Sequence, residues 1–464
     1  MLRSALAPIS TSLTLLGALL ALVGCGDNNT PAPDAPEPTS DAPVTPDVPA
    51  TADPTIAEIA SGNPDFSILV AAAARAGLVD ELSNPDVEFT VFAPTNDAFE
   101  ASGITLDAIN AMPEMQVAGI LTYHALIGRI LSADIDAGPQ TTVAGFTLFL
   151  GTDGGVAING GNAITGGADV VMADIEASNG VIHVIDRVLL PPNIPMLATY
   201  GGLTSLVGAV TSAGLADDLS AAGPFTVFAP TNDAFTALGT APTGDALVTV
   251  LLYHVLSGAV VSTEVPARAD ALAANASGNN LTLLFNTSSG VVINGGATVV
   301  AADLRATNGV VHVVDEVILP MNVVDAATAA GLTGLLGAVG AAAPLPGGTT
   351  VAAALAADAP YTVFAPTNAA FTAVESVVAG LSAAQVRDVL LYHVLNTTTF
   401  PAPVLSTDLP AAAANLDTLN SANDIPFLPG PPPTVDGAGI SLADINVTNG
   451  VVHVIDAVMV PATL

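Results

Sequence analysis

Histidine is the residue type in this chain whose spacing could support metal binding or proton transfer. The 464 residues contain six histidines, which form three pairs, and an aspartate stands three positions beyond the second histidine of each pair. Imidazole and carboxylate groups serve as metal ligands and as acid–base groups. The triplets are His124, His183 and Asp186; His254, His312 and Asp315; and His393, His453 and Asp456.

A structural role competes with this chemistry. Every histidine stands among apolar neighbours, as His183 does between Ile182 and Val184. A metal site normally needs three or four ligands, and each segment supplies only two or three. The sequence also has no Gly-x-Ser-x-Gly elbow, and its one cysteine is Cys25. We therefore expect buried hydrogen-bonding histidines, and we expect no catalytic residues, no metal, no cofactor and no enzymatic activity.

The elements that would position these histidines follow from local patterns. An Ala-rich stretch at 66–75 that ends before Gly77 predicts a helix, and 117–126 predicts a buried helix that carries Tyr123 and His124. Pro94 and Thr95 end a strand and cap a short helix, with Asn96 holding the turn. The predicted strands are 89–92, 146–150, 156–159 and 181–188. Helices early and strands late indicate an α+β fold.

The whole pattern occurs three times. Residues 90–99 recur unchanged at 226–235, and return at 362–371 with one substitution, Asp97 becoming Ala369. A Tyr-His pair and a closing Asn-Gly-Val-x-His-Val-x-Asp block follow each copy. The repeat is domain-sized, so the sequence predicts tandem domains at 54–192, 195–321 and 322–464. The third departs most: it has Val435-Asp436-Gly437 where the others have Ile-Asn-Gly-Gly, at 158–161 and 293–296.

These three motifs, in this order, resemble the fasciclin domain. The resemblance implies an α+β fold of tandem fasciclin-like domains, each a twisted β-sandwich or wedge with several packed α-helices. It also implies extracellular adhesion without enzymatic activity. By the same resemblance, the Tyr-His region and an Asp-Ile pair implicated in integrin contact in animal relatives become candidate interaction residues, although a bacterium meets no integrins. These candidates are Tyr123, His124, Tyr253, His254, Tyr392, His393, Asp174, Ile175, Asp303, Leu304, Asp444 and Ile445. The alternative for each aspartate, which we favour, is a cap on a local turn.

The N-terminus predicts export and lipid attachment. Arg3 precedes an apolar run, and Leu22-Val23-Gly24-Cys25 resembles a bacterial lipobox. We therefore expect a signal peptide at 1–25, acylation of Cys25, and a disordered Pro- and Asp-rich stalk at 26–53. Gly26 does not match the aspartate linked to inner-membrane retention, which favours the outer membrane or cell surface of a Gram-negative bacterium.

Charge restricts the partners. The formal net charge is −35, and all seven basic residues are arginines. Such a chain repels phosphate backbones and anionic lipids, so we expect no nucleic acid and membrane contact only through the N-terminal lipid. The expected partner is a cell-surface or matrix protein or polysaccharide, and homophilic contact stays open. The alternative is an extracellular small-ligand or glycan-binding protein, with a pocket at the Asp-Ile and Gly-Gly loops.

Overall fold

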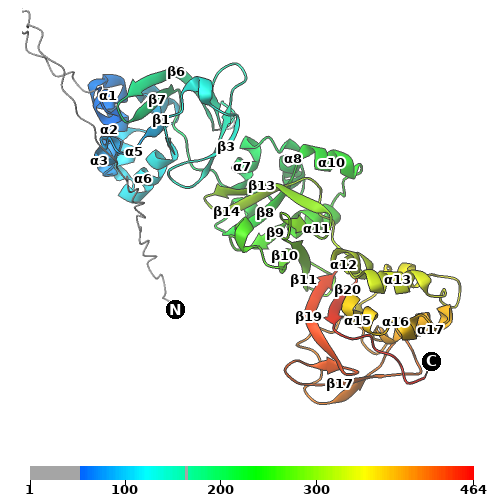
Figure 1. Cartoon of the computed structure of the whole chain (residues 1–464). Coiled ribbons are helices and arrows are strands. Elements are labelled where there is room, and N and C mark those ends of the chain that lie inside the picture. The colour runs from blue at the N-terminus through cyan, green and yellow to red at the C-terminus, as the bar shows by residue number, and fades with distance from the viewer. Residues whose placement is uncertain (1–52, 162–165, 464) are drawn as a thin grey trace, which may run out of the picture. The chain divides into compact units, whose positions relative to one another are not determined.

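The computed structural model of the chain describes residues 53–161 and 166–463 (Figure 1). Within them the chain forms three domains that share one general order of elements, with one strand fewer in domain 3. The predicted signal peptide with Cys25, and all of the predicted stalk except its last residue, lie outside the described residues. In the part that is described, no helix combines the length and the apolar character needed to cross a bilayer.

Each domain begins with helices and ends with strands, as predicted. Domain 1 contains α1 Ile56–Gly62, η1 Pro64–Phe66, α2 Ser67–Arg75, α3 Val79–Leu82, β1 Phe89–Pro94, α4 Asn96–Ala101, α5 Leu106–Ala111, α6 Glu114–Tyr123, β2 Ala125–Ile127, η2 Ser132–Asp134, β3 Gly138–Thr141, β4 Thr147–Gly151, β5 Ala157–Ile158, β6 Ala168–Ala177 and β7 Gly180–Ile185. Domain 2 contains α7 Ile194–Tyr200, α8 Thr204–Ser212, α9 Ala216–Ser220, β8 Phe225–Pro230, α10 Asn232–Leu238, α11 Asp245–Tyr253, β9 Val255–Ser257, η3 Ser262–Glu264, β10 Arg268–Ala274, β11 Asn280–Asn286, β12 Val292–Ile293, β13 Ala297–Ala306 and β14 Gly309–Val314. Domain 3 contains α12 Val323–Ala329, α13 Thr333–Ala341, α14 Val351–Leu355, β15 Tyr361–Pro366, α15 Asn368–Ala373, α16 Glu375–Val378, α17 Ala383–Tyr392, β16 Ala414–Leu416, β17 Ile425–Leu428, β18 Thr434–Val435, β19 Ala438–Val447 and β20 Gly450–Ile455.

The sheet joins the first strand of a domain to its last. In domain 1 the strand order is β2-β1-β7-β6-β5-β4-β3, with β1 and β7 parallel. Strand β6 shifts register twice along β7 and pairs with β5 at its start, so it belongs to both halves of the sheet. Such shifts bend a strand and increase its twist, which folds the sheet into a wedge. Domain 2 repeats this order and closes it into a barrel, and domain 3 has six strands.

Two apolar layers cover the two faces of the domain 1 sheet, and a third cluster, which includes Phe99 and Ile109, packs among the helices. One lies inside the folded sheet and includes Phe92, Tyr123 and Ile158. The other lies between the sheet and the helices and includes Ile56 and Phe66. The central strand β7 is buried along its whole length because it has a core on both faces.

Glycine at the start of β7 is required by backbone contact. Gly180 has a φ of +146°, and a Cβ there would lie 1.9 Å from the carbonyl oxygen of Phe89. Gly309 and Gly450 stand in the same position with a φ of +156° and +155°. The Asn-Gly pair of the closing motif therefore permits β7 to enter directly beside β1.

The helix predicted over 117–126 needs a correction at its end. It runs Glu114–Tyr123, and the chain turns at His124 before β2 begins at Ala125. The helix stops there because Ala125 pairs with Val91 of β1. Tertiary strand pairing therefore overrides the local apolar pattern.

The strand-to-helix turn forms as predicted. Thr95 is the N-cap of α4, and its side chain accepts a hydrogen bond from the Ala98 amide. Asn96 reaches further than the turn: its Oδ1 accepts from the Ile68 amide at 3.0 Å, and its Nδ2 donates to the Pro64 carbonyl at 3.0 Å. Asn232 and Asn368 make the equivalent contacts at the starts of α8 and α13. This asparagine therefore fastens the second helix to the end of the first strand.

Candidate functional site

The Tyr-His pair lies in the core at the end of α6. The His124 ring accepts the Leu189 amide at Nε2, 2.9 Å away, so Nδ1 carries the proton and donates to the Ile120 carbonyl at 2.8 Å. His254 bridges Val250 and Ile318 in this way, and His393 bridges Val389 and Met459. Each ring therefore connects, by two hydrogen bonds, the end of a helix to the segment that follows the last strand of the domain.

Burial keeps these three rings neutral. It lowers the pKa of His124 to about 4, and the hydrogen bond to Ile120 offsets only part of that effect. Burial likewise lowers the pKa of His254 and of His393 to about 4. A base near neutral pH needs a pKa close to 7, so these imidazoles are poorly matched to acid–base chemistry.

The second histidine of each pair has the opposite tautomer. Nε2 of His183 donates to the Ile130 carbonyl at 2.9 Å, and Nδ1 accepts the Asp174 amide at 3.3 Å. The ring also packs against Phe92, with centroids 5.7 Å apart. His312 and His453 repeat these contacts. Both nitrogens of all six histidines therefore have backbone partners.

The aspartates beyond the second histidines do not complete a metal site. Oδ1 of Asp186 accepts the Asp169 amide at 2.8 Å and so holds the start of β6. Asp315 and Asp456 hold the starts of β13 and β19 in the same way. Among the described residues, no group of three or more His, Cys, Asp or Glu side chains could hold a metal ion. The geometry favours the structural alternative for these residues.

Tyr123 adds a second hydrogen-bonded contact in the core. It involves Asn159, whose role the sequence motifs did not predict. The Tyr123 hydroxyl donates to the Thr147 carbonyl at 3.0 Å and accepts from Nδ2 of Asn159 at 3.1 Å. Asn159 has a φ of +53° and also accepts the Phe149 amide. Burial raises the pKa of Tyr123 well above its usual value. The Ile-Asn-Gly-Gly repeat was the available signal for this contact.

Domain 3 keeps this turn with a different side chain. Asp436 has a φ of +48°, close to the values of Asn159 and Asn294, so the backbone geometry of the turn persists. Its carboxylate lies 3.3 Å from the Tyr392 hydroxyl. Burial and the Asp436 charge raise the pKa of Tyr392 to about 12. The substitution therefore changes the hydrogen bond and leaves the turn intact.

The Asp-Ile pair forms a turn cap on the side of the sheet. Asp174 has a φ of +60°, and its carboxylate accepts the Ser132 amide at 2.7 Å and the Ser132 hydroxyl at 2.5 Å. These bonds hold the pKa of Asp174 below its usual value. Asp303 caps Ser262 and Asp444 caps Ser406 in the same geometry. The favoured alternative needs a correction: each aspartate does cap a turn, but that turn is not local, because Ser132 lies 42 positions before Asp174 in the sequence.

A family model of the fasciclin domain matches residues 64–191, 201–320 and 345–461. The chain belongs to the fasciclin domain family. The matched stretches correspond to the three repeated domains, and their α+β wedge with packed helices is the fold that the resemblance implied.

Two relatives and one solved structure are similar to parts of this chain. Protein sll1483 of Synechocystis sp. is 47% identical over 141 residues, which are 30% of this chain and 74% of that protein. Transforming growth factor-beta-induced protein ig-h3 of Sus scrofa is 30% identical over 413 residues, which are 85% of this chain and 56% of that protein. A fasciclin domain pair from the insect cell adhesion molecule Fasciclin I covers 55% of this chain and 95% of that one, with 19% identity and a TM-score of 0.35. The chain thus spans about half the length of the Sus scrofa relative.

Most of the candidate interaction residues of the three fasciclin domains are buried. The Tyr-His pairs are at most 3% exposed, so a partner could reach these side chains only by opening a domain. Of the hydrophobic members of the Asp-Ile pairs, Leu304 and Ile445 are buried, and Ile175 packs partly against the core. The side chains of Asp174 and Asp444 are 38% and 24% exposed. The carboxylates are therefore the accessible part, and an interaction role for this set stays a prediction.

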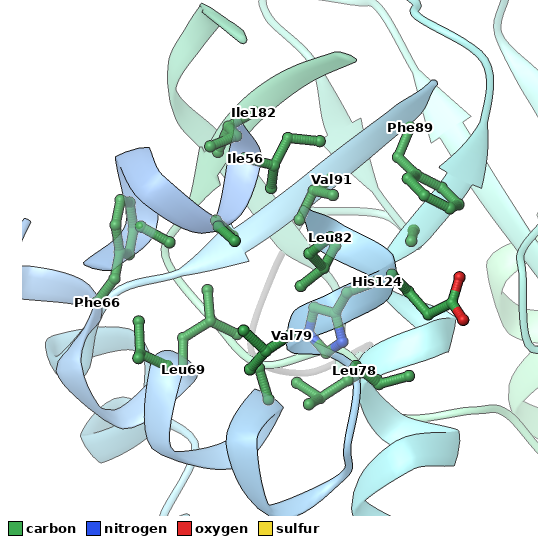
Figure 2. A pocket seen from close by; sticks show the side chains of 18 of the residues that line it. Ile56, Phe66, Leu69, Leu78, Val79, Leu82, Phe89, Val91, His124 and Ile182 are labelled. Atoms are coloured by element: carbon green, nitrogen blue, oxygen red, sulfur yellow. The ribbon is translucent and has the colours of Figure 1, made fainter. Parts of the chain in front are cut away.

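An apolar cavity lies between the helices and the sheet of fasciclin domain 1. It has a volume of about 290 Å³, and side chains of α1, α2, α3, β1 and β7 line it. Figure 2 shows Ile56, Leu69, Val91 and Ile182 around this space, with His124 among them. The cavity lies on the helical side of the sheet and is not formed by the Asp-Ile or Gly-Gly loops.

Proposed function

We propose that this chain is a lipid-anchored, extracellular adhesion protein that uses its three fasciclin domains for multivalent contact. Fasciclin domains occur in a cell adhesion molecule, as the insect protein illustrates. The observation that carries the proposal concerns the histidines, which are the groups with catalytic potential. Both nitrogens of each histidine form hydrogen bonds with the backbone inside the core. What each domain offers a partner is its surface. Three tethered copies raise avidity without any single tight site.

The proposed partners are cell-surface or matrix proteins or polysaccharides, including a second copy of this chain. The net charge of −35 opposes contact between like chains at close range, unless cations bridge them. The turn caps supply one carboxylate at an equivalent place in each domain: Asp174 is exposed, and Asp303 and Asp444 are half-buried. We therefore expect attachment to require a divalent cation.

The test uses beads coated with the full chain. We would score bead clustering and attachment to the producing cells, with calcium, with magnesium and with a chelator. Attachment should rise more steeply than in proportion to coating density, because multivalent contact needs several engaged domains at once. Absence of attachment in every condition would overturn the proposal.

A substitution series identifies the surface that is used. Asp174→Asn, Asp303→Asn and Asp444→Asn remove charge at the caps, and asparagine tolerates the left-handed backbone there. The matched control replaces one exposed aspartate per domain elsewhere, at Asp107, Asp217 and Asp358, with the same change in net charge. Loss of attachment in the first series alone supports the caps. Equal loss in both series attributes attachment to net charge only.

Lipid attachment has a separate test. The proposal places the protein at the outer membrane or cell surface through acylated Cys25. Cys25→Ser should release the protein from the membrane fraction, and mass spectrometry of the N-terminal peptide of the unmodified protein should show the added lipid. A protein that stays in the membrane fraction after Cys25→Ser would contradict the anchor.

A further inference from the structure

The cavity of domain 1 has counterparts in the other domains, and they are smaller. The equivalent spaces measure about 190 Å³ in domain 2 and about 40 Å³ in domain 3, against about 290 Å³ in domain 1. The histidine of the Tyr-His pair lines all three. The same cavity is therefore present in each domain, and side chains of the domain occupy a different share of its space in each.

Two alanines account for much of the extra space. Ala73 in α2 corresponds to Val210 in α8 and Val339 in α13, because each is the seventh residue of its helix. Ala125 follows His124 directly, and Val255 and Val394 follow the other two histidines. All six side chains line their cavities. Valine fits this fold at both positions, so the space in domain 1 is not a requirement of the fold.

We propose that the domain 1 cavity binds one uncharged hydrocarbon group, such as the chain of a neutral lipid or alcohol. A dry cavity of about 150 Å³ holds benzene, so about 290 Å³ suits roughly ten to twelve carbon atoms. Protein interiors otherwise contain few voids larger than a water molecule. The site goes beyond the adhesive role, which depends on exposed surfaces.

The polar and charged groups at the cavity argue against an anionic ligand. Both His124 nitrogens have backbone partners, the Ser61 hydroxyl donates to the Ala57 carbonyl, and the Thr122 hydroxyl donates to the Ala118 carbonyl. These groups are satisfied without a ligand. The charged residue in the lining is Glu81, which is exposed, and no arginine lines the cavity. An anionic headgroup would meet repulsion from Glu81 and would find no basic partner, so the ligand is not an anion.

The test measures binding of 1-aminonaphthalene, a fluorescent and largely apolar aromatic amine that is uncharged at neutral pH, to the purified full chain. We expect one saturable site per chain. Octan-1-ol should displace the probe, whereas octanoate, which has the same chain length and a carboxylate, should compete at least tenfold less well. Absence of saturable binding would overturn the proposal, and equal competition by octanoate would overturn its charge argument.

Variants place the probe in this cavity. Ala73→Val with Ala125→Val introduces the residues of domains 2 and 3 and should weaken binding at least tenfold. Ala74→Val is the matched control, because it adds the same side chain to an exposed position of α2. Unchanged binding by the folded double variant would overturn the assignment. Where the double variant fails to fold, Val210→Ala with Val255→Ala provides the second test: it enlarges the domain 2 cavity and should add a second site.

Discussion

Acid should weaken domain 1 through the buried imidazole of His124. His124 is neutral in the folded domain, where burial lowers its pKa from 6.5 to about 4. In the unfolded chain this ring returns to the ordinary value. Between pH 6.5 and 4 the unfolded state therefore binds more protons than the folded state, so the free energy of unfolding falls as the pH falls through this window.

The size of the effect follows from the two pKa values. One pKa unit corresponds to about 1.4 kcal/mol, so the ring accounts for about 3 kcal/mol once the pH lies well below 4. Of this, about 2 kcal/mol should be lost between pH 7.5 and 5. The Asp174 carboxylate does not interfere, because its pKa lies below 3.8 and it titrates at lower pH.

The assay is hydrogen exchange read by mass spectrometry, which reports domain 1 separately through peptides from α6 and β7. The comparison is His124→Gln, which keeps one donor and one acceptor but does not titrate. The variant should be less stable at pH 7.5, and the difference between the two proteins should shrink by about 2 kcal/mol at pH 5. This difference cancels the general effect of acid on a chain of net charge −35. A difference that stays constant over this range would refute the argument.

Two further predictions concern backbone positions in domain 1, each read as a change in urea unfolding. Gly180→Ala should destabilise the domain by about 3 kcal/mol or more, because the added Cβ would clash with the Phe89 carbonyl. Gly119→Ala should instead stabilise the domain by about 0.5–1 kcal/mol, because Gly119 lies inside α6 with open space around it. Equal effects of the two changes would contradict the contact. Asp174→Gly removes the cap on Ser132 and should cost about 1–2 kcal/mol, and Asp174→Ala should cost about 1 kcal/mol more because Ala also disfavours a φ of +60°. Identical stability of these two variants would show that the backbone conformation is not strained.

The sequence predicted the elements that depend on short-range chemistry. Thr95 caps its helix, and Gly77 follows the end of α2 with a φ of +68°. The family assignment rested on three motifs, and each is structural: Phe92 and Val181 are buried, and Asn179 accepts the Ile56 amide. Motifs of this kind repeat because packing constrains them.

Features that depend on long-range contact were not predictable in this way. The end of α6 depends on strand pairing between Ala125 and Val91, which local pattern does not encode. The Asn159 contact with Tyr123 joins residues that lie 36 positions apart. The cavity requires Ala73 and Ala125 to face the same space from a helix and a strand, and neither alanine is distinctive in an Ala-rich chain.

Comparison of the three repeats distinguishes residues that stabilise the fold from residues that could contact a partner. Residues that recur in all three domains, such as His124, His254 and His393, are buried, so a partner cannot distinguish domains through them. Exposed positions differ: Ile127, which is 74% exposed, corresponds to Ser257 and Asn396, and Met172, which is 58% exposed, corresponds to Ala301 and Leu442. The three domains therefore present different surfaces on one scaffold. A change at such a position in one domain should therefore leave attachment through the equivalent turn caps in place, and loss of bead attachment in one of three single-domain variants would show that the domains do not contribute equally.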